Sequence, residues 1–440
     1  LHVWLPEAHP AAPSPVSALM SGVMLKTAIY GLVRVNFDLL GSPLWWWGVV
    51  ALVVGLATAL FGVVFAAAQV DMKRLLAYSS IENVGLIVVG LGLAIVFAAY
   101  RMGSLAALAL VASLYHCLNH AMFKSLLFLG TGSVLHATQE RNLGKLGGLM
   151  RFMPWVAWTT LVGVVASAGL PPSNGFVSEW LLLQGFLFTG DLPNPYLRML
   201  VPVFAAGVVL VAALAGYVMV KFFGVIFLGR PREEKLAQAH DAGGLERLGL
   251  AWLTAGCVLL GLFPVAVIEV MDPITTALVG RGLALSGRAG DWLLLAPMSA
   301  ERASYSPILF LLVTAAVVFA AIVLVRRFYH GRVRRAAPWD CGFPAQTARM
   351  QDTAEGFGQP IRQIFEPFYR MHRELPTPFD TAPRYKVTVE DPLWGWVYLR
   401  IAAATEAASR WVGMLQRGRI SIYLLYSFLT LVALLFLTQA

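Results

Sequence analysis

The sequence predicts an all-α integral membrane protein, a polytopic bundle of membrane-spanning helices. Of its 440 residues, 58% are hydrophobic and 13% are charged, and the mean hydropathy is +0.70. Soluble domains carry roughly 25% charged residues. Apolar runs of about 20 residues, long enough to cross a hydrocarbon layer of about 30 Å, recur along the whole chain with short basic loops between them. Water is therefore not the main solvent of this chain.

The apolar runs define the elements in chain order. They predict spans at 15–37, 45–69, 73–97, 103–136, 153–189, 198–228, 247–270, 305–327 and 420–438. The span 103–136 must tilt or protrude, because it is too long for one straight crossing. The span 153–189 is interrupted by AGLPPSNGF, whose proline and glycine residues break a helix. Such a break is tolerated only inside protein or beside a wet cavity, and it marks many transport sites.

Basic residues predict the orientation, because loops rich in lysine and arginine stay in the cytoplasm. This places residues 1–14 and the polar stretch 328–418 inside and the C-terminus outside, with Trp45–Trp47 at the outer interface. The richer side contains Lys73, Arg74, Arg141, Lys145, Arg151, Arg230, Arg232, Lys235, Arg326, Arg327, Arg332, Arg334 and Arg335. The basic residues that give the net charge of +9 lie at predicted helix ends, as is usual in a membrane protein. We therefore expect no nucleic-acid partner.

Asp391 and Pro392 are typical of an N-cap and a first helical position. They predict an amphipathic helix that continues to about Arg417. A helix lying along the membrane surface fits this pattern. Packing against a soluble partner is the alternative.

Neither a metal nor a cofactor is expected in this chain. Cys117, Cys257 and Cys341 lie far apart and form no CxxC or Cys/His ligand pattern. The sequence also shows no P-loop and no dinucleotide-binding fingerprint. The chain begins at Leu1, within an apolar phrase, without an initiator methionine or a signal peptide. We therefore expect the natural chain to extend further upstream.

Three titratable residues share one face of the span 103–136. His116, His120 and Lys124 follow one another at i, i+4 and i+8, which gives a stripe about 12 Å long at 1.5 Å per residue. A single buried histidine is commonly a satisfied core residue. Three such groups in an apolar span, where each charge costs roughly 2.5–3.5 kcal/mol, predict a proton relay.

Two further residues fit the same chemistry. Lys26 lies near the middle of its span, where burial favours the neutral amine and makes proton release accessible. Snorkelling to the interface is the alternative for this lysine. Glu179 follows the break in 153–189, where the dipole of the second half-helix stabilises a carboxylate. It is a candidate for proton uptake or release.

Lys73 and Lys221 are weaker candidates. Lys73 stands beside Arg74 at the cytoplasmic end of a span, so that a positive-inside anchor explains it equally well. Lys221 is flanked by aromatic residues and lies deeper in its span, which favours a functional role. Glu82 and Asn83 could pair with one of the lysines and lower its desolvation cost. The sequence assigns no role to His2, Glu7 and His9.

Four segments resemble signatures of the antiporter-like, proton-translocating subunits of respiratory complex I, multi-subunit sodium/proton antiporters and membrane-bound nickel-iron hydrogenases. They are LHVWLPEAHPAAPSPVSALMSGVMLKTAIYG, DMKRLLAYSSIENVG, HCLNHAMFKSLLFLGTGSV and AGLPPSNGFVSEW. Further on, PWDCGFPAQTARMQDTAEGFGQPI and GRISIYLLYSFLTLVALLF are similar to the hydrogenase-4 component B and formate hydrogenlyase subunit 3 branch.

The resemblance implies two inverted five-helix repeats, each with one broken helix. It assigns 1–44 to the end of the first repeat, 45–228 to the second, 229–327 to additional spans, 328–418 to a cytoplasmic segment and 419–440 to a last span. Only the last helix of the first repeat, 15–37, is then present. The glutamate–lysine pair of that repeat would lie upstream of Leu1, so the fragment alone is not expected to form the whole path.

Residue by residue, the resemblance implies a proton path. Lys26 corresponds to the bridging lysine of the family, Lys124 with His116 and His120 to the central relay, and Glu179 to the terminal group. Lys73 also falls on a lysine of the family.

The expected function is therefore that of a proton-translocating membrane subunit of a group 4 hydrogenase-like or complex I-related complex. The resemblance places it in the inner (plasma) membrane, with other membrane subunits, cytoplasmic nickel-iron hydrogenase-like and iron–sulfur subunits as partners. The redox centres would be in those partners. A sodium/proton antiporter subunit and a structural scaffold that does not pump are the alternatives.

Overall fold

The computed structural model describes residues 2–41, 43–283, 294–298, 304–329, 336, 339, 341–343, 345–348, 350–383, 385–415 and 418–439. The chain divides into two compact units, Leu1–Gln363 and Ile364–Ala440, and each is described by itself. Arg332, Arg334 and Arg335, which contributed to the predicted orientation, lie outside the described residues.

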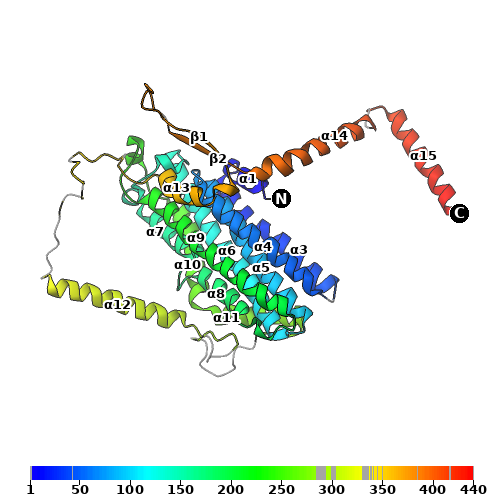
Figure 1. Cartoon of the computed structure of the whole chain (residues 1–440), viewed down its shortest axis with the longest axis horizontal. Coiled ribbons are helices and arrows are strands. Elements are labelled where there is room, and N and C mark those ends of the chain that lie inside the picture. The colour runs from blue at the N-terminus through cyan, green and yellow to red at the C-terminus, as the bar shows by residue number, and fades with distance from the viewer. Residues whose placement is uncertain are drawn as a thin grey trace. The chain divides into compact units, whose positions relative to one another are not determined.

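The first unit begins with a helix that breaks early (Figure 1). Helix α1, Trp4–Ala11, is followed by α2, Ser14–Leu19, and at Pro13 between them the backbone is extended, with ψ at 149°. A π-helical turn, η1, Met20–Met24, leads into α3, Leu25–Val33, and a second one, η2, Arg34–Leu39, ends this span. The sequence predicted the span but missed α1, since this helix is short and contains two prolines.

Three long helices form the centre of the unit. They are α4, Trp45–Ala68, α5, Met72–Ala99, and α6, Gly103–Thr138. Their bounds confirm the predicted spans within two residues. Nearly every residue of α5 and most residues of α6 are buried. Such helices, apolar on all sides, belong in the interior of a bundle.

Glycines bring α4 and α5 into backbone contact. Gly48, Gly55 and Gly62 of α4 recur every seven residues and face Gly92, Gly85 and Glu82 of α5. A Cβ added at Gly85 would lie 2.4 Å from the backbone nitrogen of Ala59. Small residues of this kind allow membrane helices to pack closely.

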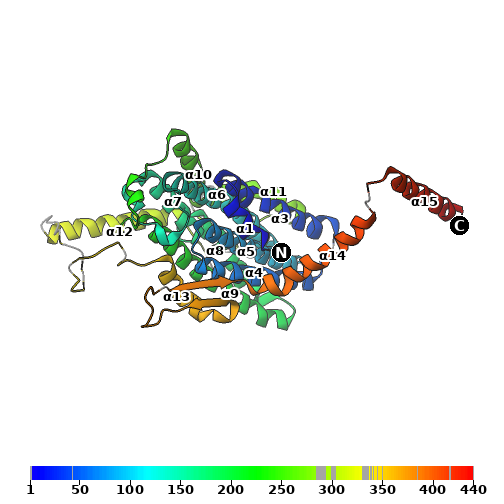
Figure 2. The same cartoon turned by 90° about the horizontal axis from the view of Figure 1, so that it is seen from above.

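The predicted interruption of 153–189 is confirmed. Helix α7, Pro154–Ser167, ends before the two prolines, and α8, Asn174–Leu187, begins after them. The long helix α9, Pro195–Phe227, follows. Seen from above, α5 and α8 lie inside the bundle, with α9 and α10 on opposite sides of it (Figure 2).

The predicted span 247–270 is wrong as a single helix. The structure has α10, Gly244–Leu262, and α11, Pro264–Val279, with a non-helical turn at Phe263. Pro264 explains the break, because a proline cannot continue a helix and restricts the residue before it. Helix α12, Pro307–Phe328, confirms the next predicted span, and α13, Ala354–Ile364, lies against α4 and α9.

Short 3-10 turns connect the helices of this unit. They are η3, Leu143–Lys145, η4, Leu149–Arg151, η5, Thr189–Asp191, and η6, Glu234–Gln238.

The second unit contains a hairpin that sequence reasoning missed. After the turn η8, Glu366–Phe368, strand β1, Arg370–Glu374, pairs antiparallel with β2, Lys386–Glu390, in the register Arg370↔Glu390. The π-helical turn η9, Trp394–Tyr398, then leads into α14, Leu399–Leu415, and α15, Ile420–Gln439, follows. The Asp391 side chain accepts a hydrogen bond from the Leu393 amide at 2.8 Å, which confirms the predicted cap.

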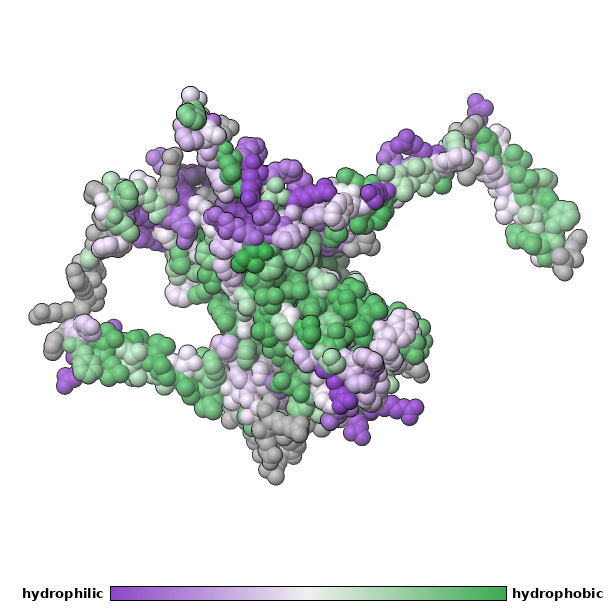
Figure 3. Space-filling model, viewed as in Figure 1, coloured by the Kyte–Doolittle hydropathy of each residue, from purple (hydrophilic) through white to green (hydrophobic). Residues whose placement is uncertain are grey.

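The structure supports a protein embedded in a membrane. The described part of the chain has eight helices long and apolar enough to cross a bilayer. Over the helices of the first unit, apolar residues form a band between polar ends (Figure 3). At one end, ion pairs join loops that were predicted to be cytoplasmic. Arg141 Nε lies 2.9 Å from Asp71 Oδ2, and Lys235 Nζ lies 3.4 Å from Glu140 Oε2. These loops therefore lie on one side of the membrane, as predicted.

The close contact between α4 and α5 makes Gly85 sensitive to substitution. Replacing Gly85 by alanine should destabilise the protein by about 1–3 kcal/mol, because α4 and α5 must separate to admit the methyl group. Gly216→Ala in α9 is the matched control, since a Cβ added there would meet nothing within 4 Å. Thermal unfolding of the detergent-solubilised protein measures both. Equal melting temperatures for the two variants would contradict the close packing.

Candidate functional site

The predicted stripe on α6 is buried in the middle of the bundle. His120 and Lys124 are fully inaccessible and His116 is 4% exposed. Polar side chains of α5 and α8 and the Lys26 amine contact these three residues. The structure thus places the stripe where the surrounding helices, and not water, must supply its hydrogen bonds.

Lys26 reaches the stripe from α3. Its Nζ atom makes a short hydrogen bond with Nδ1 of His120 and donates to the Ser21 carbonyl at 2.7 Å. Ser21 belongs to the π-helical turn that precedes Lys26, and π turns of this kind are frequent at functional sites. Lys26 is half-buried. It therefore lies against the relay and does not snorkel away from it.

A serine hydroxyl connects Lys124 to a buried carboxylate. Lys124 Nζ donates to Ser79 Oγ at 2.6 Å, and Ser79 Oγ donates to Glu82 Oε2 at 3.0 Å. Glu82 is 1% exposed. A buried amine and a buried carboxylate stabilise each other's charged forms, and the hydroxyl between them both accepts and donates. Lysine, serine and glutamate form a continuous hydrogen-bonded chain.

His116 connects the stripe to the broken helix. Its Nε2 atom lies 3.1 Å from Asn83 Oδ1, and its Nδ1 atom lies 2.9 Å from Ser178 Oγ in α8. Asn119, one turn further along α6, donates to Ser178 Oγ at 2.9 Å and to the Asn174 carbonyl at 2.7 Å. The first turn of α8 is thus held on α6 by side-chain hydrogen bonds.

Glu179 stands next to Ser178 and lies at the break itself. A Cβ built on Gly169 would lie 2.3 Å from Glu179 Oε2, so only a glycine leaves room for the carboxylate there. Gly169 also has a φ of +61°, which a glycine adopts at no steric cost. Glu179 is half-buried and follows Ser178, whose hydroxyl contacts His116. The carboxylate therefore lies next to the residue that connects α8 to the stripe.

Lys73 lies at the N-terminal end of α5 and is 2% exposed. Its Nζ atom donates to the Ala12 carbonyl at 2.7 Å, at the end of α1. Arg141 donates to the neighbouring Pro10 carbonyl at 3.2 Å. Cations at a helix C-terminus stabilise its unpaired carbonyls. Lys73 is thus tied to the break between α1 and α2.

Lys221 lies apart from the stripe. Its Nζ atom donates to the Ala67 and Gln69 carbonyls, both at 2.7 Å, at the C-terminal end of α4. Gly358 of α13 packs over this amine. Among the described residues, Lys221 shares no hydrogen-bond partner with His116, His120 or Lys124. Its contacts are those of a residue that caps a helix end.

The sequence did not place Ser79 or Ser178 in the site. Ser79, Glu82 and Asn83 share one face of α5, because they are spaced by three and four residues. The polar group SSIEN in the middle of an apolar helix was the available signal. The contacts of Ser178 come from the break before α8, which sequence spacing cannot reveal.

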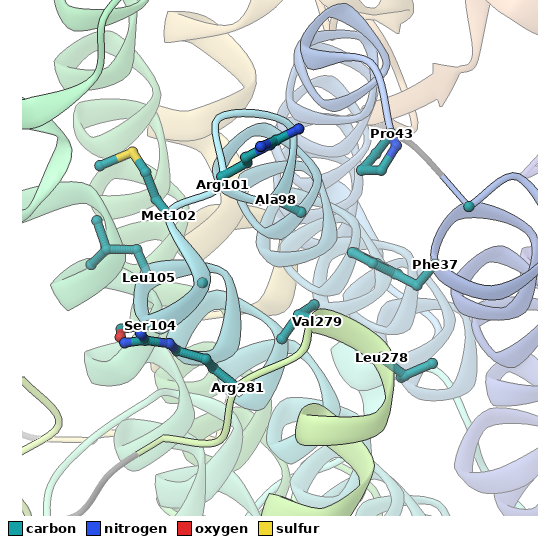
Figure 4. Close-up of a pocket in the computed structure, with 12 residues that line it drawn as sticks. Phe37, Pro43, Ala98, Arg101, Met102, Ser104, Leu105, Leu278, Val279 and Arg281 are labelled. Atoms are coloured by element: carbon teal, nitrogen blue, oxygen red, sulfur yellow. The ribbon is translucent and has the colours of Figure 1, made fainter.

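A cavity of about 650 Å³ lies at the other end of the bundle, by the turn between α5 and α6 and the end of α11. Arg101 and Arg281 line it together with apolar side chains, and their guanidinium groups point in different directions (Figure 4). The described residues that line it include no histidine, lysine or carboxylate. The cavity is therefore separate from the hydrogen-bonded stripe.

Comparison with known proteins identifies relatives along the whole chain. Hydrogenase-4 component B of Escherichia coli (strain K12) is 34% identical over 457 residues, which cover 99% of this chain and 66% of the relative. Formate hydrogenlyase subunit 3 of the same organism is 34% identical over 396 residues, 88% of this chain and 60% of the relative. The chain thus spans a little under two thirds of the lengths of these two relatives.

The fold is also found in a solved structure of an archaeal respiratory membrane complex, the membrane-bound sulfane sulfur reductase. The TM-score is 0.72 at 23% identity, and the match covers 99% of this chain and 65% of the other. This likeness concerns the fold.

Residues 1–192 match the family model for the transmembrane part of the NADH:quinone oxidoreductase/Mrp antiporter proteins. The chain belongs to this family of antiporter-like membrane subunits, in the branch that contains hydrogenase-4 component B.

Proposed function

We propose that this chain moves protons across the membrane as a subunit of a group 4 nickel-iron hydrogenase-like or complex I-related complex. One observation carries the proposal. Titratable side chains from α3, α5 and α6 are buried together, and hydrogen bonds or single-turn spacing connect each of them to the next. Such groups are rare within membrane helices, and they mark ion pathways.

The contacts suggest an order for proton transfer. Lys26 contacts His120, which lies one turn from Lys124 on α6. Lys124 continues through Ser79 to Glu82. His116 lies one turn from His120 in the other direction and leads through Ser178 to the α8 turn that carries Glu179. A proton taken up at one group raises the cost of charge on its neighbours, which drives the proton onward.

Lys73 and Lys221 are proposed as peripheral members of the relay. Both are buried amines at helix ends near the basic loops. Their bonds to backbone carbonyls also give each of them a structural role. Comparing alanine variants of the two lysines separates these roles, because a capping residue lowers stability and a relay residue lowers proton movement.

The complex and the orientation are part of the proposal. The relationship to hydrogenase-4 component B supports cytoplasmic nickel-iron hydrogenase-like and iron–sulfur subunits as partners, besides other membrane subunits and lipid. We place the redox centres in those partners and no cofactor in this chain. The basic loops support an inner-membrane orientation with 328–418 in the cytoplasm and the C-terminus outside.

Replacing Lys124 by alanine in the full-length protein tests the function. Proton movement into vesicles should fall at least tenfold, since the link between His120 and Ser79 is lost. Lys145→Ala is the control, because Lys145 is exposed and forms its ion pair with Glu140, at 3.5 Å, away from the stripe. A pH-sensitive dye reports the movement in the assembled complex. Normal proton movement in the Lys124 variant would refute the relay and favour a structural scaffold. Coupling of proton movement to a sodium gradient would favour a sodium/proton antiporter.

Replacing Ser79 by alanine tests the bridge between Lys124 and Glu82. The change leaves both buried groups without their shared partner, at a cost of about 1–3 kcal/mol, and should slow proton movement severalfold. Ser113→Ala is the matched control on α6, because Ser113 is equally buried and donates to a backbone group, the Ile87 carbonyl, at 2.8 Å. Equal rates in the two variants would show that the hydroxyl of Ser79 takes no part.

A further inference from the structure

His9 is a buried histidine that the relay described above does not use. It lies near the end of α1 and is fully inaccessible. Its ring stacks on Phe128 of α6, with the ring centroids 4.6 Å apart and the planes at 22°. Ser17 Oγ donates to the His9 carbonyl at 3.0 Å and so ties its backbone to α2 across the break.

The position of His9 continues the stripe on α6. His116, His120 and Lys124 recur every four residues, and Phe128 is the next residue in that series. Phe128 itself cannot carry a proton. The imidazole that lies on it comes from α1, so the row of titratable groups gains one more member at its cytoplasmic end.

Neither ring nitrogen of His9, Nδ1 or Nε2, has a hydrogen-bond partner among the described residues. A buried polar atom without a partner costs about 1–3 kcal/mol, so a histidine with a purely structural role would ordinarily be satisfied. Stacking explains the place of the ring but not the choice of histidine over an apolar aromatic residue.

Two relay lysines lie next to the elements that hold His9 in place. Lys73 is tied to the Ala12 carbonyl, three residues after His9, and Lys124 lies one turn before Phe128. No hydrogen bond among the described residues joins these two lysines directly. His9 belongs to α1, next to whose end Lys73 is bound, and its ring lies on Phe128, one turn from Lys124.

We propose that His9 transfers protons between Lys73 and Lys124, so that α1 contributes a relay residue to the stripe of α6. A neutral imidazole accepts a proton on one ring nitrogen and releases one from the other. The ring returns to its first tautomer by rotation, and no net charge stays on it. Lys73 is then joined to the central relay, which gives the cytoplasmic end of α5 a role in the path.

This inference rests on the proposed function, and His9→Phe in the full-length, assembled complex tests it. Phenylalanine keeps the stack on Phe128 but cannot carry a proton. Proton movement should fall about tenfold or more while assembly and thermal stability stay at wild-type levels. His136→Phe is the matched control, because His136 is an exposed histidine of α6 outside the relay. Its Nδ1 atom lies 3.5 Å from Glu246 Oε1.

A second pair of variants separates proton transfer from packing. Phe128→Leu weakens the stack and keeps the imidazole, so it should lower thermal stability but keep most proton movement. His9→Gln retains polarity without a transferable proton and should behave as His9→Phe does.

Normal proton movement in both His9 variants, beside an inactive Lys124→Ala, would refute the role of His9 and leave the proposed function standing. A loss in Phe128→Leu as large as in His9→Phe would also refute it. Normal movement in Lys124→Ala would refute both proposals.

Discussion

The buried contact of Lys124 with Ser79 and Glu82 is the constraint on which the rest of the structure depends. Charges in a medium of low polarity are stable only when they are paired and hydrogen-bonded. Lys124 and Glu82 lie on different helices, so α5 and α6 must stay in fixed register for the hydroxyl of Ser79 to bridge them. The glycines that join α4 to α5 help to hold that register, because Gly62 packs directly against the backbone of Glu82.

Breaks in two helices bring further polar groups to this pair. The break between α1 and α2 offers the Ala12 carbonyl to Lys73 and places His9 against Phe128. The break between α7 and α8 turns Ser178 toward His116 and places Glu179 over Gly169. Backbone groups freed in this way are stable in a membrane only when protein surrounds them. The breaks and the buried stripe therefore support one another.

Much of this site could be predicted from the sequence. The spacing of His116, His120 and Lys124 requires only that the segment be helical, and the prolines after Leu170 make a break unavoidable. The turn at Phe263 was also signalled, by Pro264, but the apolar run around it concealed the break. The hairpin of β1 and β2 was missed, because its strands have only five residues each and are largely exposed, and β1 lacks alternation of apolar and polar residues.

The sequence by itself determined which residues carry protonatable groups within apolar helices, and on which helical face each of them lies. This follows from local geometry, since helical spacing is the same in every helix. Only the tertiary structure decided the partners: Lys26 with His120, Lys124 with Ser79, and His9 on Phe128. Those contacts join residues separated by 45 to 119 positions (Ser79 to Lys124 and His9 to Phe128), and helix packing rather than spacing brings them together.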